Sequence, residues 1–323
     1  MSAVEGVWPA ELDGVFDRTL TCEYASLTRD LRPITWAVTP YRGERSLDVS
    51  TGLSYPDKAE RARRNPQVAL LFSDPTGCPS ATTSVVLVRG HARVRDADLQ
   101  ANTDRYVRES LAKTSGMNAT PWVLRRRMSW YFSRIWIEVW PESMLWWPGG
   151  DLEAEPLRWD GGPLTVAPSD PAPVGKRSSG RLRPPVDWRP FADRAQGLGA
   201  PVLTTVANGS PLPLRTRGVR RTADGFRVEL PAGVAAVDGP ACLTFHRVGP
   251  GLEWQENVVL VGRASVQGAS AEVTVERALN DWSLAGSRWQ RMRAFTGPGR
   301  SLRRRLAHEA ARRGQPVPTV RRA

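Results

Sequence analysis

The pattern of apolar and polar positions divides the first half of the chain into short strands. Alternating positions predict a strand with one buried face, and a run that is apolar at nearly every position predicts a strand buried on both faces. Residues 67–73 form a run of the second kind, and Asn65-Pro66 before it ends a short helix that begins near Pro56. The predicted strands cover residues 20–27, 34–40, 47–50, 67–73, 84–95 and 134–142, with further helices at 9–20 and 96–110.

The second half of the chain repeats this pattern after an interruption. Residues 258–264 (VVLVGRA) are similar to residues 85–92 (VVLVRGHA), which predicts a second, degenerate copy of the first unit. Strands of this copy are predicted at residues 202–207, 211–217, 225–230, 241–247 and 257–266. The boundaries that follow are a first domain at 1–148, a Pro- and Gly-rich linker at 149–188, a second domain at 189–286 and an Arg-rich C-terminal segment at 287–323.

Composition is that of an ordinary globular protein. The chain has 323 residues, of which 41% are hydrophobic and 24% charged, and no apolar run approaches the length of a membrane span. Three widely spaced cysteines, Cys22, Cys78 and Cys242, argue against a disulfide framework and against a zinc site. The first residues lack the basic and apolar regions of a secretory signal, so the predicted location is the cytoplasm.

The net charge of +12 is concentrated at the C-terminus. Residues 287–323 contain eleven Arg and one acidic residue, Glu309, so ten of the twelve net charges lie there. Leu302, Leu306 and Ala310 recur at helical spacing and predict an amphipathic helix, whereas the last ten residues are expected to be frayed. Such a segment could bind nucleic acid, a membrane surface or an acidic partner. No nucleic-acid recognition motif accompanies it, so a specific role in binding nucleic acid is not expected.

The candidate chemistry lies in the corner between strand 47–50 and the helix that follows it. Ser50, Thr51 and Ser54 supply hydroxyl groups, and Lys58 supplies a positive charge in the first helical turn. Because free backbone N–H groups at a helix start attract anions, this combination predicts a phosphate site. The alternative is that Ser54 only caps the helix and Lys58 is a solvated helix charge.

The corner and the strand after it also carry a family resemblance. The motif reads Val49-Ser50-Thr51, then Lys58, then Asn65-Pro66-Gln67-Val68-Ala69-Leu70-Leu71-Phe72. It resembles the pyridoxamine 5'-phosphate oxidase-like superfamily of FMN-binding split β-barrels, over residues 16–147. The resemblance implies a mainly β (α+β) fold of two tandem six-stranded antiparallel split barrels of Greek-key type, with short flanking helices. The FMN-binding residues that it implies are Thr35, Trp36, Ala37 and Val38 for the ring and Ser50, Thr51, Ser54 and Lys58 for the phosphate.

Two positions depart from the superfamily's pattern. Trp36 stands where pyridoxamine-phosphate oxidases place an Arg for the flavin phosphate, and Ser84 or Val85 stands where they have a Gln. The resemblance therefore implies a flavin-dependent oxidoreductase that transfers hydride between FMN and an unidentified small molecule, and puts the pyridoxamine phosphate reaction itself in doubt. The alternatives are a deazaflavin-dependent reductase, a non-catalytic flavin or haem carrier, and an interaction protein without a cofactor. The candidate haem ligands are His91, His246 and His308.

The second copy lacks the phosphate corner. Residues 231–236 contain no Lys and no hydroxyl side chain, and they are too few for a full helix. We therefore expect one flavin per chain, bound where the two copies form a pseudo-dimer or where a homodimer forms. The second copy is expected to cover the ring with Trp254 or His246, and the segment from Gly299 onward is expected to be dispensable for cofactor binding.

Overall fold

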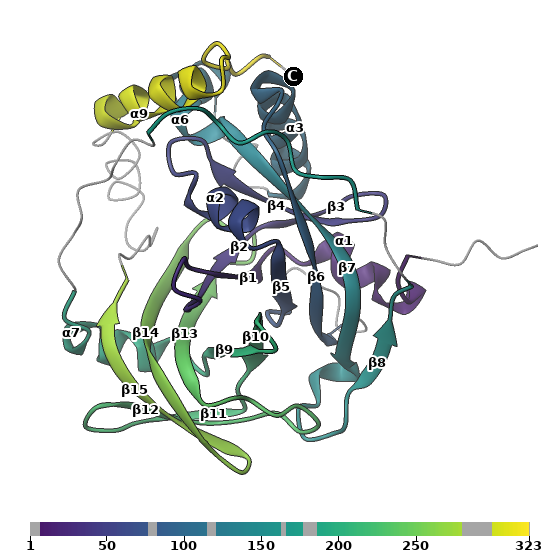
Figure 1. The fold of residues 1–323 in the computed structure, drawn as a ribbon, viewed down its shortest axis with the longest axis vertical. Coiled ribbons are helices and arrows are strands. Elements are labelled where there is room, and N and C mark those ends of the chain that lie inside the picture. Colours follow the sequence, from purple (N-terminus) through teal and green to yellow (C-terminus); the bar gives the residue numbers. More distant parts are fainter. Residues whose placement is uncertain are drawn as a thin grey trace, which may run out of the picture.

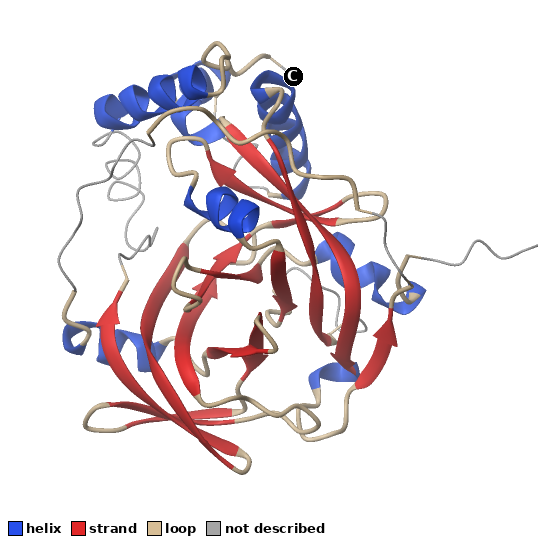
Figure 2. Cartoon of the chain, in the orientation of Figure 1, coloured by secondary structure: helices blue, strands red, loops and turns tan. Residues whose placement is uncertain are grey.

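The chain forms two curled antiparallel β-sheets surrounded by helices (Figures 1 and 2). The computed structural model describes residues 7–76, 83–114, 121–162, 166–176, 186–279 and 299–322. Figure 2 shows the two longest helices at one end of the molecule, beside the first sheet, while the second sheet forms the opposite end. The predicted mainly β fold of tandem units is confirmed.

The first sheet is organised around its longest strand, β7, which pairs with β6, β4 and β8. The close approach of β6 and β7 requires a glycine at position 90, because a Cβ there would lie 2.3 Å from the Trp140 carbonyl oxygen. The strand order is β2-β1-β5-β6-β7-β4-β3, with β8 added on β7. The strands are β1 (Cys22–Leu27), β2 (Pro33–Val38), β3 (Pro40–Arg42), β4 (Leu47–Gly52), β5 (Gln67–Phe72), β6 (Val85–Arg95), β7 (Arg134–Trp147) and β8 (Leu157–Asp160).

The second sheet repeats the first strand for strand. Its order is β10-β9-β13-β14-β15-β12-β11, which matches β2-β1-β5-β6-β7-β4-β3 at every position and confirms the predicted internal repeat. Each unit has seven common strands rather than six, because a strand of three or four residues, β3 or β11, lies between two predicted strands. In the second unit the strand β15 is also missing from the prediction. The strands are β9 (Val202–Ala207), β10 (Ser210–Arg215), β11 (Gly218–Arg221), β12 (Gly225–Glu229), β13 (Gly239–Val248), β14 (Gln255–Gln267) and β15 (Ser270–Ala278).

The two sheets share a hydrophobic core along β1 and β5. Tyr24 and Leu70 point into the core of the first unit, whereas Ala25 and Leu71 pack in a second cluster with residues of the other sheet such as Leu203. Both faces of β5 are therefore covered, as its continuous apolar run predicts. The two units therefore pack against each other within one chain.

Most of the helices pack on the first unit, and α7 packs on β11 and β14 of the second. Asp98 caps the longest helix through a hydrogen bond that its carboxylate accepts from the backbone N–H of Ala101 at 2.8 Å. In the described ranges, none of the helices is long and apolar enough to cross a membrane. They are α1 (Asp13–Arg18), α2 (Asp57–Arg64), α3 (Leu99–Lys113), α5 (Trp122–Arg127), α6 (Ser129–Phe132), α7 (Arg189–Gly197) and α9 (Gly299–Arg312), with 3-10 turns at Ala10–Leu12 and Pro148–Gly150.

The C-terminal segment is part of the first unit rather than a separate tail. Leu302, Leu306 and Ala310 of α9 are buried in the core of the first unit, which confirms the predicted amphipathic helix. The expectation of frayed last residues is wrong. The chain after α9 runs back along α3, where the Gln100 side chain makes two hydrogen bonds of 2.9 Å with the backbone N–H and carbonyl of Thr319. These bonds hold the last residues in place.

Candidate functional site

The predicted phosphate corner is built where β4 ends and α2 begins. Gly52 lies opposite Arg134 of β7, and the next residue, Leu53, donates its N–H to the Ser133 carbonyl at 2.9 Å. The chain then turns, and α2 begins after Pro56 with no side chain capping it. The prediction that Ser54 caps this helix is therefore wrong.

Two of the three predicted hydroxyl groups donate their hydrogen bonds within the fold. Thr51 donates to the Tyr55 carbonyl at 2.9 Å, and Ser54 donates to the Leu302 carbonyl of α9 at 3.2 Å. Both side chains are buried, while Ser50 is half-buried. Ser50 and Thr51 also point to opposite faces of the strand, as successive residues must. The three hydroxyls thus do not converge on a single point.

Lys58 is the predicted residue that has the properties of an anion ligand. Its side chain is half-buried on α2, with the amino nitrogen 5.9 Å from the centre of the Trp36 ring. Burial lowers the pKa of Lys58 to about 8, and the positive charges of Arg61 and Arg134 contribute to this shift while Asp57 opposes it. Among the residues that the structure describes, no carboxylate forms an ion pair with Lys58.

Arg134 is a second cation at this corner, and sequence reasoning missed it. Its guanidinium donates to the Tyr106 hydroxyl at 2.9 Å and lies 4.2 Å and 4.6 Å from the ring centres of Tyr106 and Tyr131. Its Nε atom is buried without a hydrogen-bond partner in the described ranges. A half-buried guanidinium on tyrosine rings, beside a lysine with a lowered pKa, forms a region of positive charge that an anion would stabilise.

The predicted ring-binding strand, β2, lies at the junction of the two sheets. Thr35 is fully enclosed there, since its hydroxyl meets the Thr204 hydroxyl at 2.6 Å and its carbonyl accepts from Thr244 at 3.1 Å. Trp36 is half-buried against Val259 and Val261 of β14. The structure thus brings Trp36 and Lys58 together and directs Thr35 into the contact with the second sheet.

β2 also offers backbone groups to a ligand. It is an edge strand of the first sheet, so one row of its N–H and C=O groups is not used within that sheet. Ala37 and Val38, like Trp36, are half-buried rather than enclosed. A planar ligand at this edge would lie near Trp36, whose ring also faces the Lys58 ammonium.

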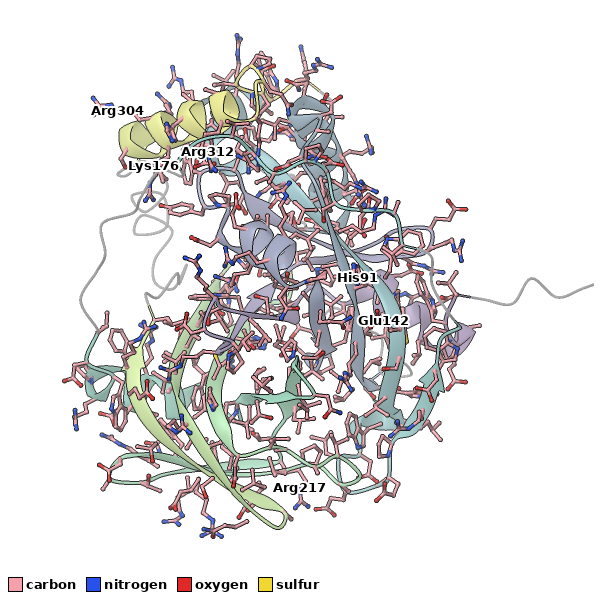
Figure 3. The ribbon with its side chains drawn as sticks, in the orientation of Figure 1. His91, Glu142, Lys176, Arg217, Arg304 and Arg312 are labelled. Atoms are coloured by element: carbon pink, nitrogen blue, oxygen red, sulfur yellow. The ribbon has the colours of Figure 1, made fainter. Side chains whose placement is uncertain are left out.

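The three histidines lie far apart in different surroundings. His246 is buried and its Nε2 meets Glu23 Oε1 at 2.6 Å, across the junction of the two sheets. His91 lies half-buried on β6 (Figure 3), and the exposed His308 contacts the Lys176 carbonyl at 3.1 Å. The described residues contain no cluster of three potential metal ligands.

Cys22 and Cys242 are buried free thiols, and Cys78 lies outside the described residues.

No protein-family model and no curated protein sequence matches this chain. Solved structures match about half of it. A candidate pyridoxamine 5'-phosphate oxidase from Listeria innocua is 20% identical, with 40% of this chain and 90% of that chain covered and a TM-score of 0.28.

Two further matching structures are named for other cofactors. An F420 reductase is 18% identical, with 42% of this chain and 98% of that chain covered and a TM-score of 0.32. The haem storage protein HutZ from Vibrio cholerae is 13% identical, with 41% of this chain and 88% of that chain covered and a TM-score of 0.28. Each of these matches covers less than half of this chain.

Proposed function

We propose that the chain binds one FMN at the junction of its two sheets and acts as an FMN-dependent oxidoreductase on a small molecule. The observation that carries the proposal is Lys58, a half-buried lysine with a lowered pKa and no carboxylate partner in the described part of the chain, held beside Trp36. Leaving such a charge unpaired is unfavourable, and a phosphate dianion would remove the cost.

The residues present fit the two ends of a flavin nucleotide. Lys58 and Arg134 supply positive charge for the phosphate, and the free edge of β2 at the half-buried Ala37 supplies backbone groups for a ring. FMN when bound supplies the hydride chemistry, and the chain's own residues hold and orient it and exclude water. The predicted hydroxyl ligands Ser50, Thr51 and Ser54 keep a smaller role in this proposal, because two of them donate elsewhere.

One FMN per chain follows from the same comparison of the two units. Between β12 and β13, in the described residues 230–238, the second unit has no helix and no lysine at the position that α2 and Lys58 occupy in the first. Without those groups a phosphate there would lose its hydration with nothing to replace it.

A flavin titration tests the proposal. Loss of a charge-assisted contact to phosphate costs about 1.5–3 kcal/mol, so Lys58→Ala should weaken FMN binding roughly ten- to hundred-fold. Arg64→Ala is the matched control, because Arg64 is an exposed cation at the other end of α2. Equal FMN affinity in Lys58→Ala and the unaltered protein, with the fold intact, would refute the site. A visible spectrum with a Soret band after haem addition, at a stoichiometry of one, would favour the haem-carrier alternative instead.

A further inference from the structure

The end of the molecule that carries α5 and α9 has an unusual concentration of arginine. The two helices are in contact there, since Arg303 donates to the Arg127 carbonyl at 3.0 Å. Figure 3 shows Arg304 projecting from α9 at this end, far from Arg217 beside the second sheet. We call this surface the arginine patch, and its members are Arg125, Arg126, Arg127, Arg303, Arg304 and Arg305.

The charges of the arginine patch are not neutralised by the fold. Within the described ranges no member forms an ion pair with a carboxylate, and Arg126, Arg127, Arg303 and Arg304 are exposed. The acidic residue of α9, Glu309, is fully buried and pairs with Arg312 and Arg313, which are not members of the patch. Two members instead lie over aromatic rings, Arg126 over Trp122 and Arg305 over Tyr55.

Exposed apolar side chains lie within the same surface. Val123 and Leu124 of α5 are 57% and 36% exposed, and no residue of α5 is buried. Tyr55, beneath Arg305, is 48% exposed. A short helix that presents Val123 and Leu124 to solvent next to three arginines has the composition of an interfacial membrane segment, in which apolar side chains enter the headgroup boundary and arginines meet lipid phosphates.

We propose that the arginine patch docks the protein on an anionic lipid bilayer surface, with Val123 and Leu124 inserted and the arginines among the phosphates. A cluster of basic residues of this size is what binding to anionic lipids requires, since each contributes near the surface and several together give stable attachment. Single-stranded nucleic acid would also satisfy the arginines, but it offers no apolar phase for Val123 and Leu124. This inference is independent of the flavin site.

Co-sedimentation of the full-length protein with vesicles tests this proposal. The vesicles are phosphatidylcholine alone, or phosphatidylcholine with phosphatidylserine, at low and at physiological salt. The charge variant replaces four exposed members of the patch, Arg126→Gln, Arg127→Gln, Arg303→Gln and Arg304→Gln. The matched control removes the same charge from four exposed arginines of the second sheet, by Arg220→Gln, Arg227→Gln, Arg247→Gln and Arg263→Gln.

The proposal expects binding that requires phosphatidylserine and weakens with salt. The charge variant should lose on the order of a hundred- to thousand-fold in partition coefficient, and the control should lose much less. A third variant, Val123→Ser with Leu124→Ser, keeps every charge and should lose about tenfold. Circular dichroism confirms that each variant is folded.

Three outcomes would overturn the proposal. The first is the absence of phosphatidylserine-dependent binding, and the second is an equal loss in the control variant. The third is vesicle binding that Val123→Ser with Leu124→Ser leaves unchanged, together with tight, salt-sensitive binding of single-stranded RNA. That third result would assign the arginine patch to nucleic acid.

Discussion

The charge state of Lys58 should control the affinity of this protein for FMN. Burial, with Arg61 and Arg134 nearby, lowers the pKa of Lys58 to about 8 in the cofactor-free protein. Lys58 is therefore mostly protonated at about pH 7 and mostly neutral at about pH 9, whereas the phosphate group is a dianion throughout this interval. A bound phosphate holds the ammonium in its charged form, so binding above pH 8 must also take up a proton.

The expected change in FMN affinity follows from the difference between the pH and the pKa of Lys58. One unit above the pKa only about a tenth of Lys58 is protonated, so FMN affinity at about pH 9 should be roughly tenfold weaker than at pH 7, or about 1.4 kcal/mol. Affinity should be nearly constant below the pKa. The sign is the reverse of that for a carboxylate ligand, which would bind its partner better as pH rises.

Quenching of FMN fluorescence, titrated from about pH 6.5 to about pH 9.5 at constant ionic strength, measures this dependence. Lys58→Arg keeps a positive charge at every pH, so the alkaline weakening should disappear in that variant. Arg64→Ala, the control on the same helix, should retain it. The reasoning would be refuted by a wild-type affinity that does not change between pH 7 and 9, or by an alkaline weakening that persists in Lys58→Arg.

Three further predictions concern stoichiometry and stability. The same titration should reach saturation at one FMN per chain, and two equivalent sites would contradict the difference between the two units. His246→Ala should lower the free energy of unfolding by about 1–3 kcal/mol in urea, because it removes one of the two hydrogen bonds of the buried Glu23 side chain and leaves only the one from Ser73, whereas His91→Ala should change it by less than about 0.5 kcal/mol. Leu306→Ala should cost about 2–5 kcal/mol, since this α9 side chain is buried in the core of the first unit, and a value near zero would show that α9 does not pack there.

The sequence predicted those features that depend on local pattern. The continuous apolar run at 67–73 indicated a strand covered on both faces, and the structure supplies the second sheet that covers it. The strands β3 and β11 escaped prediction because three or four residues carry too little alternation to be recognised. Leu302, Leu306 and Ala310 gave the correct amphipathic helix, but the pattern does not say which core it enters.

The features that sequence reasoning missed depend on contacts between distant residues. Ser54 has the spacing of a helix cap, yet its hydroxyl bonds to a carbonyl 248 residues away. Arg134 enters the candidate site only because the β4–β7 register places it opposite Gly52, and nothing in its neighbourhood in the sequence indicates that pairing. The dispensability of the segment from Gly299 onward for cofactor binding stays a prediction, although the hydrogen bond from Ser54 ties α9 to the corner.

The presence of Trp36 in place of an arginine has a physical explanation in the tandem arrangement. Position 36 packs against Cys242, Val259 and Val261 of the second sheet, so its environment is apolar and is fixed within the same chain. An indole there adds apolar contact with these side chains, whereas an arginine would have to bring part of its charge against them. On our proposal the positive charge for the phosphate comes instead from Lys58 and from Arg134 on β7, which lies away from this contact and rests on tyrosine rings.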